Sequence, residues 1–264
     1  MKRLLAALGL AVLAVGFDAA THDAQAQIAN VNEAINKAGR QRMLSQRMAK
    51  AYLQVGLGAD ADQSRRNMTY SVSVFDRQLV ELKNYAPNAD VKNTYLLLET
   101  AWLAYKDVLI GMAPSKEGAR KVLELSERVL ELAHKGTTQL VEISGTESGP
   151  LVGMAGRQRM LSQRIAKFYQ ALAWGTAPAN AQAELEKARK EFNVGMRALA
   201  LAPATTKDIK DELEKARQQW TAVEALLDSK SPDRKAGSAG MALASERLLD
   251  ALENVTAMFE KLNK

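Results

Sequence analysis

Cysteine is absent from this chain of 264 residues, and histidine occurs only twice. Without thiols the protein can form no disulfide, use no cysteine nucleophile and carry no lipid on a cysteine. After residue 26 only His134 remains, which is too few for a histidine metal site, and we interpret it as an ordinary surface or packed residue. The sequence also contains no nucleophile elbow and no glycine-rich phosphate loop. These absences argue against an enzyme, so we expect no catalytic residue, no cofactor and no metal.

Long apolar runs are missing too, apart from one at the start of the chain. Two basic residues precede an apolar stretch from Leu4 to Phe17, and Ala24-Gln25-Ala26 follows it. A charged start, a short apolar core and a small-x-small end are typical of a signal peptide. The run is shorter than the roughly 20 residues that cross a bilayer, which disfavours the alternative of an uncleaved anchor. We predict a signal peptide over residues 1–26, cleavage after Ala26, and a periplasmic protein that does not insert into the membrane.

The charge balance is moderately basic, with a formal net charge of +6. In a cytosolic protein such an excess would suggest nucleic acid as a partner. In an exported protein it reflects small anions, acidic surfaces or nothing specific. We therefore expect no nucleic-acid partner.

One stretch of the sequence occurs twice. The ten residues AGRQRMLSQR occupy Ala38–Arg47 and again Ala155–Arg164, 117 positions apart. Further residues match at nearly the same offset: Lys50 with Lys167, Tyr52 with Tyr169, Phe75 with Phe192, Trp102 with Trp220, and Ser126-Glu127-Arg128 with Ser245-Glu246-Arg247. The chain is therefore predicted to hold two copies of one structural unit.

The composition is typical of helices, because alanine, leucine, glutamate, lysine and arginine dominate and apolar residues recur at intervals of three and four. Turn signals predict helices over 28–57, 61–85, 88–112, 115–144, 150–175, 179–201, 204–228 and 232–262, with Ser231-Pro232 as the start signal of the last. Short loops favour antiparallel bundles. We predict an all-α protein of two tandem four-helix bundles, residues 27–146 and 147–264, arranged as an intramolecular pseudo-dimer.

The first predicted helix carries an apolar seam that an arginine interrupts. Steps of three and four along this helix reach Ile28, Val31, Ile35, Ala38, Arg42, Ser45, Ala49 and Tyr52. Such a seam lets a helix pack lengthwise on a partner, and a second apolar stripe on the same helix implies a second neighbour. The second copy repeats the seam, with Arg159 in the place of Arg42.

The two seam arginines, Arg42 and Arg159, need a negative partner. A guanidinium at a packed position is costly without one, because it cannot lose its charge. The sequence supplies no carboxylate nearby, since neither Asp nor Glu occurs over residues 34–59 or 148–183. The partner is either an acidic residue from another helix or a bound anion, and the residues alone leave both alternatives open.

Gly39 and Gly156 lie one turn before these arginines. Glycine inside a helix costs about 1 kcal/mol relative to alanine, so both positions need an explanation. Close helix packing is one explanation. The other is that the missing side chain uncovers backbone that a small ligand can touch.

The stretch AGRQRMLSQRMAK resembles the motif that opens the PilJ-type domain, the sensory domain of type IV pili methyl-accepting chemotaxis transducers. It is also similar to the conserved box in the sensor domain of nitrate/nitrite sensor histidine kinases. The resemblance implies four-helix bundles that dimerise through their first helix. In the nitrate-sensing members, one nitrate lies between two copies of the box, held by an arginine from each and by backbone near the glycine. The matching residues in this sequence are Arg42, Arg159, Gly39 and Gly156.

The resemblance implies a periplasmic sensory or binding protein for a small oxyanion, with nitrate first and nitrite second. Family members carry transmembrane helices and output domains. We do not expect these in this sequence, so the expected partner in signalling is a membrane receptor or sensor kinase. The alternative is a ligand-free helical adaptor or structural protein that docks on a receptor, a sensor kinase or a pilus component. A saturable gain in thermal stability with a small oxyanion distinguishes the binder from the adaptor.

Overall fold

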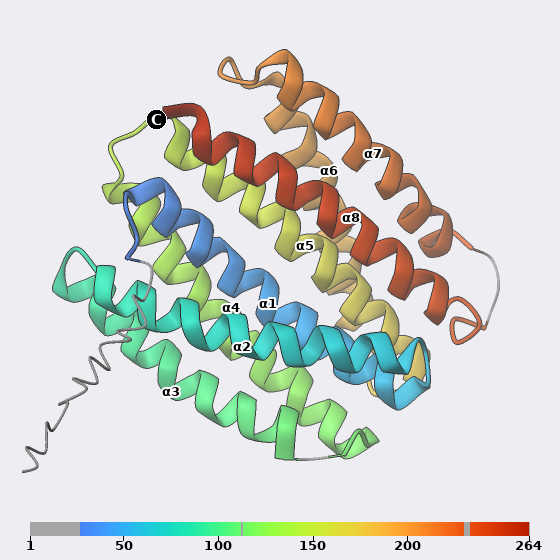
Figure 1. Cartoon of the computed structure of the whole chain (residues 1–264). Helices are drawn as coiled ribbons and strands as arrows, with labels where there is room; N and C mark the ends of the chain where they lie inside the picture. Colours follow the sequence, from blue (N-terminus) through green and yellow to red (C-terminus); the bar gives the residue numbers. More distant parts are fainter. Residues whose placement is uncertain (1–26, 112, 230–232, 264) are drawn as a thin grey trace, which may run out of the picture.

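The computed structural model describes residues 27–111, 113–229 and 233–263, and within them the chain forms eight α-helices, one short 3-10 helix and no strand. The first half contains α1 (Val31–Leu57), α2 (Ala61–Tyr85), α3 (Ala89–Gly111) and α4 (Lys116–Ile143) (Figure 1). The second half contains α5 (Ser148–Trp174), α6 (Ala181–Leu201), α7 (Lys207–Leu227), α8 (Ser238–Glu260) and the 3-10 helix Lys261–Asn263. The predicted all-α class is confirmed, whereas the predicted signal peptide over residues 1–26 lies outside the described residues.

Local sequence signals set several helix boundaries. α1 begins after Asn30, whose side-chain oxygen accepts a hydrogen bond from the backbone N–H of Glu33. α4 begins in the same way after Ser115. α1 and α5 each end at a glycine with positive φ, Gly58 and Gly175, in the left-handed conformation that glycine adopts without strain.

The predicted start of the last helix is wrong by several residues. The predicted cap, Ser231, lies outside the described residues, and α8 begins only at Ser238. Between them, the carboxylate of Asp233 accepts hydrogen bonds from the backbone N–H groups of Lys235 and Ala236, at 2.9 and 3.3 Å. This turn uses N–H groups near the expected helix start, so the helix forms only beyond it.

α1 and α5 lie side by side at the centre of the molecule (Figure 1). They run parallel and in register, because Asn32 at the start of α1 donates to Ser148 at the start of α5, while the ring of Trp174 covers Gly56 at the opposite ends. α2 and α4 pack against α1, and α6 and α8 pack against α5. α3 and α7 complete the two bundles, so the predicted pseudo-dimer through the first helix of each half is confirmed.

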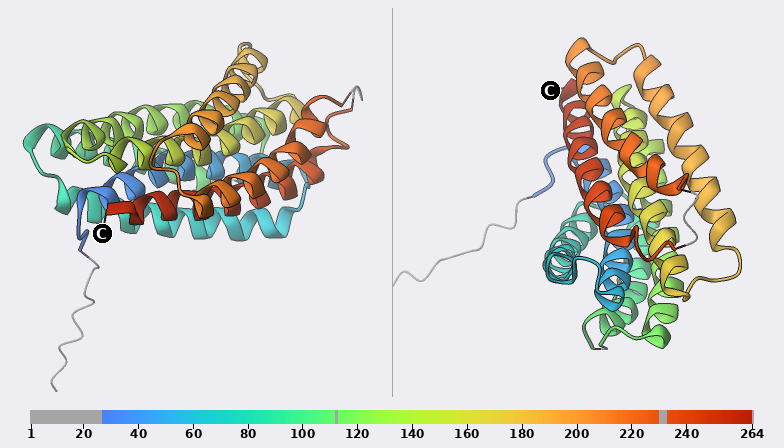
Figure 2. Two further views of the ribbon diagram at one scale, coloured as in Figure 1. Left: turned by 90° about the horizontal axis from the view of Figure 1, so that it is seen from above. Right: turned by 90° about the vertical axis from the view of Figure 1, so that its right-hand side faces the viewer.

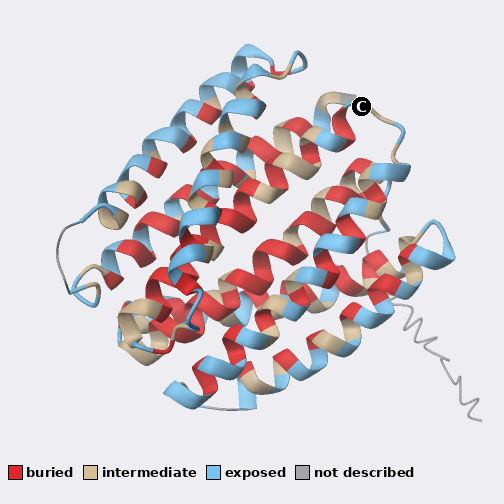
Figure 3. Cartoon of the chain, turned by 180° about the vertical axis from the view of Figure 1, so that it is seen from behind, coloured by how far each residue is buried: buried red, intermediate tan, exposed pale blue. Residues whose placement is uncertain are grey.

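The outer helices lie on opposite sides of this central pair, with α2 and α3 on one side and α6 and α7 on the other (Figures 1 and 2). Burial follows the same arrangement, since red buried positions concentrate on the inner helices in Figure 3. Eighteen of the 27 residues of α1 are buried, whereas α7 buries five of 21. α1 therefore has neighbours on more than one face, as its two apolar stripes predicted. Among the described helices, none has the length and apolar character needed to cross a bilayer.

The matching aromatic residues of the two halves make matching contacts. Phe75 stacks on Trp102 with ring centroids 4.1 Å apart, and Phe192 lies 4.3 Å from Trp220. Each indole N–H donates to a side chain on the helix that carries the phenylalanine, Asp76 in the first half and Asn193 in the second. The repeat read from the sequence is therefore also a repeat in three dimensions.

Candidate functional site

Gly39 and Gly156 meet where α1 packs on α5. A Cβ atom added to either glycine would lie 3.6 Å from the Cα atom of the other. The same added atom would lie 3.3 to 3.4 Å from the Nη2 atoms of both Arg42 and Arg159. Glycine at both positions lets the two backbones approach and leaves room for both guanidinium groups. The structure thus brings together all four residues that the sequence singled out.

Arg159 is fully buried and has a carboxylate partner. Its Nη1 donates to Glu253 on α8 at 2.5 Å, and its Nη2 donates to the backbone and side-chain oxygens of Asn36 on α1, at 3.2 and 2.7 Å. Burial lowers the pKa of Arg159, and the charge of Glu253 acts against this shift. Glu253 also pairs with Arg40 at 2.7 Å. Glu253, on another helix, is thus a carboxylate partner of Arg159, the kind of partner that one of the two alternatives from the sequence required.

Arg42 is 3% exposed, but no carboxylate of the described residues pairs with it. Its Nη2 donates to the carbonyl oxygen of Gly153 on α5 at 2.9 Å, and its Nη1 lies 3.3 Å from Nδ1 of His134 on α4. Its Nε is buried without a partner in the described structure. Burial, together with the charges of Arg157 and Arg159, lowers the pKa of Arg42 to about 9. Arg42 is still protonated at neutral pH, so a positive charge is buried there without a counterion from the described residues.

The contrast between the two arginines arises from one pair of equivalent positions. Ser126 on α4 matches Ser245 on α8 at an offset of 119 residues. The same offset makes His134 on α4 the equivalent of Glu253 on α8. The remaining contacts follow the symmetry, because each arginine donates to a backbone oxygen at an equivalent place on the other central helix, Gly153 or Asn36. The interpretation of His134 from the sequence as an ordinary residue missed its position beside Arg42. Applying the repeat offset to the fourth helix of each half would have revealed the difference.

Tyr95 on α3 is a further buried polar residue, close enough to Arg42 for the charge of the guanidinium to affect its pKa. Its hydroxyl is buried and has no hydrogen-bond partner among the described residues. It lies against α4, since a Cβ atom added to Gly136 would be 3.1 Å from it. Burial raises the pKa of Tyr95, and the charge of Arg42 opposes part of that shift, so the phenol stays neutral and keeps its O–H donor. By the offset of the matching tryptophans, Leu213 stands at this place in the second half.

Ion pairs further along α1 and α5 tie each half to the other. They join Arg47 and Lys50 on α1 to Glu246 on α8, and Arg164 and Lys167 on α5 to Glu127 on α4. Burial would raise the pKa of Glu246, but Lys50 and Arg47 outweigh it and lower that pKa to about 2. These contacts hold the two central helices in register on the C-terminal side of the arginine pair.

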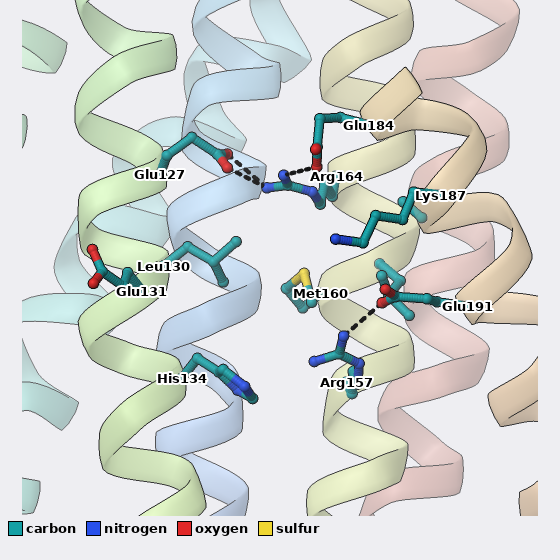
Figure 4. Close-up of a pocket in the computed structure, with 12 residues that line it drawn as sticks. Glu127, Leu130, Glu131, His134, Arg157, Met160, Arg164, Glu184, Lys187 and Glu191 are labelled. Atoms are coloured by element: carbon teal, nitrogen blue, oxygen red, sulfur yellow. Dashed lines mark hydrogen bonds and ion pairs between the residues drawn. The ribbon is translucent and has the colours of Figure 1, made fainter. Parts of the chain in front are cut away.

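A groove between α4, α5 and α6 leads to His134 (Figure 4). Its volume is about 430 Å³, and its charged or titratable lining residues are Glu127, Glu131, His134, Arg157, Arg164, Glu184, Lys187 and Glu191. Arg164 bonds to Glu127 and Glu184, and Arg157 bonds to Glu191, as the dashed lines in Figure 4 mark. The ammonium group of Lys187 points into the groove and makes no ion pair with a described residue.

The arrangement is that of an all-helical module with two matching halves and a buried arginine pair at their interface. A family model for the type IV pili methyl-accepting chemotaxis transducer N-terminal domain, PilJ, matches the chain twice, over residues 24–129 and 146–251. These matches cover most of the chain, which therefore belongs to this family and contains two tandem copies of its domain. Searches of curated proteins and of solved structures each gave no significant match. The family is one of receptor sensory domains, so the chain is a sensory or adaptor protein.

Proposed function

We propose that the protein binds a small oxyanion between α1 and α5, with nitrate preferred over nitrite, and presents the bound state to a membrane receptor or sensor kinase. The observation that carries this proposal is the guanidinium of Arg42, which is buried, protonated and unpaired with any described carboxylate. Burying a charge without a counterion costs several kcal/mol. An anion would supply the missing charge and accept from the unused donors.

The chemistry around Arg42 favours a planar anion with a single charge. Two guanidinium groups offer planar forks of N–H donors, and the glycine pair leaves backbone uncovered beside them. Glu253 gives Arg159 a carboxylate partner, which it shares with Arg40, whereas Arg42 has no carboxylate partner among the described residues. Sulfate and phosphate bring more charge and lose more hydration on burial. Chloride lacks acceptors with a defined direction.

The proposed location is the periplasm, after removal of residues 1–26. The short apolar run and the small residues that follow it support export. Domains of this family typically sense signals outside the cell, which is consistent with that location. Mass spectrometry of the native protein tests it, and a mature chain that begins at Gln27 is the expected result.

Calorimetric titration of the protein with nitrate tests the binding proposal. We expect a single site with a dissociation constant of roughly micromolar order, about −8 kcal/mol, and only a mild loss of affinity with added salt. Nitrite should bind more weakly, and sulfate, phosphate and chloride should produce little heat. Absence of heat with millimolar nitrate, in protein confirmed free of carried-over anion, would refute the proposal.

A second candidate, the ligand-free adaptor, is favoured by one surface feature. Large exposed apolar residues recur every seven positions on α3, at Leu96, Leu103 and Ile110, which are 44, 54 and 64% exposed. The matching positions on α7 and at its C-cap hold polar residues, Glu214, Thr221 and Asp228. An exposed apolar stripe on one half only is suited to docking on another protein. An adaptor that works through this stripe would show no saturable gain in melting temperature with nitrate.

A further inference from the structure

His134 lies between the buried arginine and the groove. Its Nδ1 is 3.3 Å from Nη1 of Arg42, and the same residue lines the groove, where it is partly exposed. On the opposite side of the pair, Glu253 holds the equivalent position and pairs with Arg159 and Arg40. A carboxylate repels an approaching anion, whereas an imidazole can donate to one. An anion can therefore approach the site from the His134 side, whereas Glu253 repels it on the other side.

We propose that His134 is a third anion-contacting residue, that the anion reaches Arg42 past it from the groove between α4, α5 and α6, and that binding is coupled to proton uptake by its imidazole. This inference rests on the proposed function, because it requires an anion at Arg42. It goes further because it states from which side the anion enters and which residue takes up a proton when the anion binds.

The charged and titratable groups around His134 come from the helices packed about it. They are Arg42 on α1, Glu131 on α4 itself, Arg157 on α5, and Lys187 and Glu191 on α6, while Tyr95 on α3 lies against Gly136, two positions further along α4. Burial lowers the pKa of His134 most, Arg42 and Arg157 lower it further, and Glu191 opposes them. Without an anion the imidazole is therefore neutral at neutral pH. Its ring then supplies no charge to the groove.

An anion between Arg42 and His134 changes this balance. It offsets the positive potential of the arginines and accepts from a protonated ring, and both effects raise the pKa of His134. By linkage, the anion must bind more tightly when the imidazole is protonated. Affinity should be constant above the pKa of the complex, rise as the pH falls between the two pKa values, and level off below that of the free protein.

Titration of the protein with nitrate at fixed ionic strength, in buffers without competing oxyanions, measures this dependence. Between about pH 7.5 and about pH 5.5 we expect the dissociation constant to fall several-fold, up to about tenfold, because burial and the arginines lower the pKa of His134 in the free protein and the anion raises it. His134 is the only histidine after residue 26, so few other groups titrate in that window. Ring NMR signals of His134, recorded with and without nitrate, report its pKa directly.

Two substitutions separate contact from charge. His134→Gln keeps a hydrogen-bond donor that cannot take up a proton, so binding should persist at about pH 7.5 and lose its tightening in acid. His134→Glu copies Glu253 and gives Arg42 an internal counterion, so nitrate binding should fall by at least tenfold while the protein stays folded. Lys135→Gln changes the neighbouring exposed position on α4 and serves as the control, with no expected effect.

The outcomes distinguish this inference from the proposed function. If nitrate binds and Arg42→Ala abolishes the binding, but the affinity is independent of pH and His134→Glu binds like the wild type, the inference is wrong and the proposed function stands. If the wild-type protein binds no nitrate at any pH in this range, both are wrong. Loss of the acid tightening in His134→Gln, with unchanged circular dichroism, supports the inference.

Discussion

The repeated motif places the same arginine in two different electrostatic surroundings. Arg159 has Glu253 within 2.5 Å, whereas Arg42 has an imidazole and a carbonyl oxygen. Both arginines are buried and lie against the same pair of glycines. A single difference between the halves, histidine in place of glutamate on the fourth helix, therefore leaves Arg42 without the carboxylate partner that Arg159 has.

Replacing Arg42 by methionine, which keeps most of its volume, should raise the free energy of unfolding in nitrate-free solution by about 1 to 3 kcal/mol, because it removes an uncompensated buried charge. Arg159→Met should instead lower it by about 2 kcal/mol, less than for a typical buried pair because Arg40 still partners Glu253. Urea unfolding in a nitrate-free buffer compares the two. Equal destabilisation by both would mean that Arg42 is compensated in a way its contacts do not reveal.

At the level of elements, the backbones of α1 and α5 approach each other closely at the glycine pair. An alanine at residue 39 would bring Cβ within 3.3 to 3.4 Å of both guanidinium groups. We expect Gly39→Ala to leave stability within about 1 kcal/mol of wild type, since the gain in helix propensity offsets the tighter packing. Nitrate affinity should nevertheless drop at least tenfold, because the methyl group occupies space beside both arginines. Gly111→Ala, at a helical glycine whose added Cβ meets nothing within 4 Å, is the matched control for calorimetry.

The helices and their central pair were predictable because the information is local. A seam with steps of three and four identified α1 and α5, and two apolar stripes indicated two neighbours. The start of α8 was not predictable from its proline, because the Asp233 turn competes there. The partners of Arg42 and Arg159 were not predictable either, because spacing on one helix does not specify which residue of another helix faces it. The repeat offset does make His134 the equivalent of Glu253, but only the packed structure shows that these two residues contact the two arginines.

At the level of the whole molecule, buried ion pairs link the two halves. Lys50 is fully buried, and its pKa is lowered by burial even though Glu246 opposes the shift. The pKa of Glu246 is lowered to about 2. The lowered pKa of Lys50 reflects a destabilising cost, the burial of its ammonium group. The lowered pKa of Glu246 reflects a stabilising gain, the attraction of its carboxylate to Lys50 and Arg47. The net contribution of the pair is therefore smaller than the shift of Glu246 alone indicates.

Glu246→Gln should destabilise the protein by about 3 kcal/mol at neutral pH, because it leaves Lys50 buried without a counterion. The contribution of Glu246 is fully present above its ordinary pKa of 4.5 and is lost as the pH falls through about 2. The variant should therefore lose less stability than the wild type between those two pH values. Urea unfolding across this range measures both effects. The double variant Glu246→Gln with Lys50→Met should recover most of the stability that Glu246→Gln alone loses at neutral pH. Parallel pH profiles for wild type and variant would contradict this role.

The parallel pairing of α1 with α5 should also survive separation of the two halves. In a fragment of residues 27–144, two copies of α1 can pair in register as α1 and α5 do, because Lys50 of one copy meets Glu127 of the other as Lys167 does in the full chain. We therefore expect this fragment to form a homodimer.

Its interface would hold two Arg42 and two His134 residues and no equivalent of Glu253, so the buried charge would exceed that of the full chain. Nitrate should then strengthen the dimer, whereas a fragment of residues 148–263, which brings Glu253 in each copy, should dimerise with little dependence on nitrate. Sedimentation velocity over a range of concentrations, with and without nitrate, measures both, and a first-half fragment that stays folded and monomeric in millimolar nitrate would show that the α1 seam pairs only when the two halves are covalently joined.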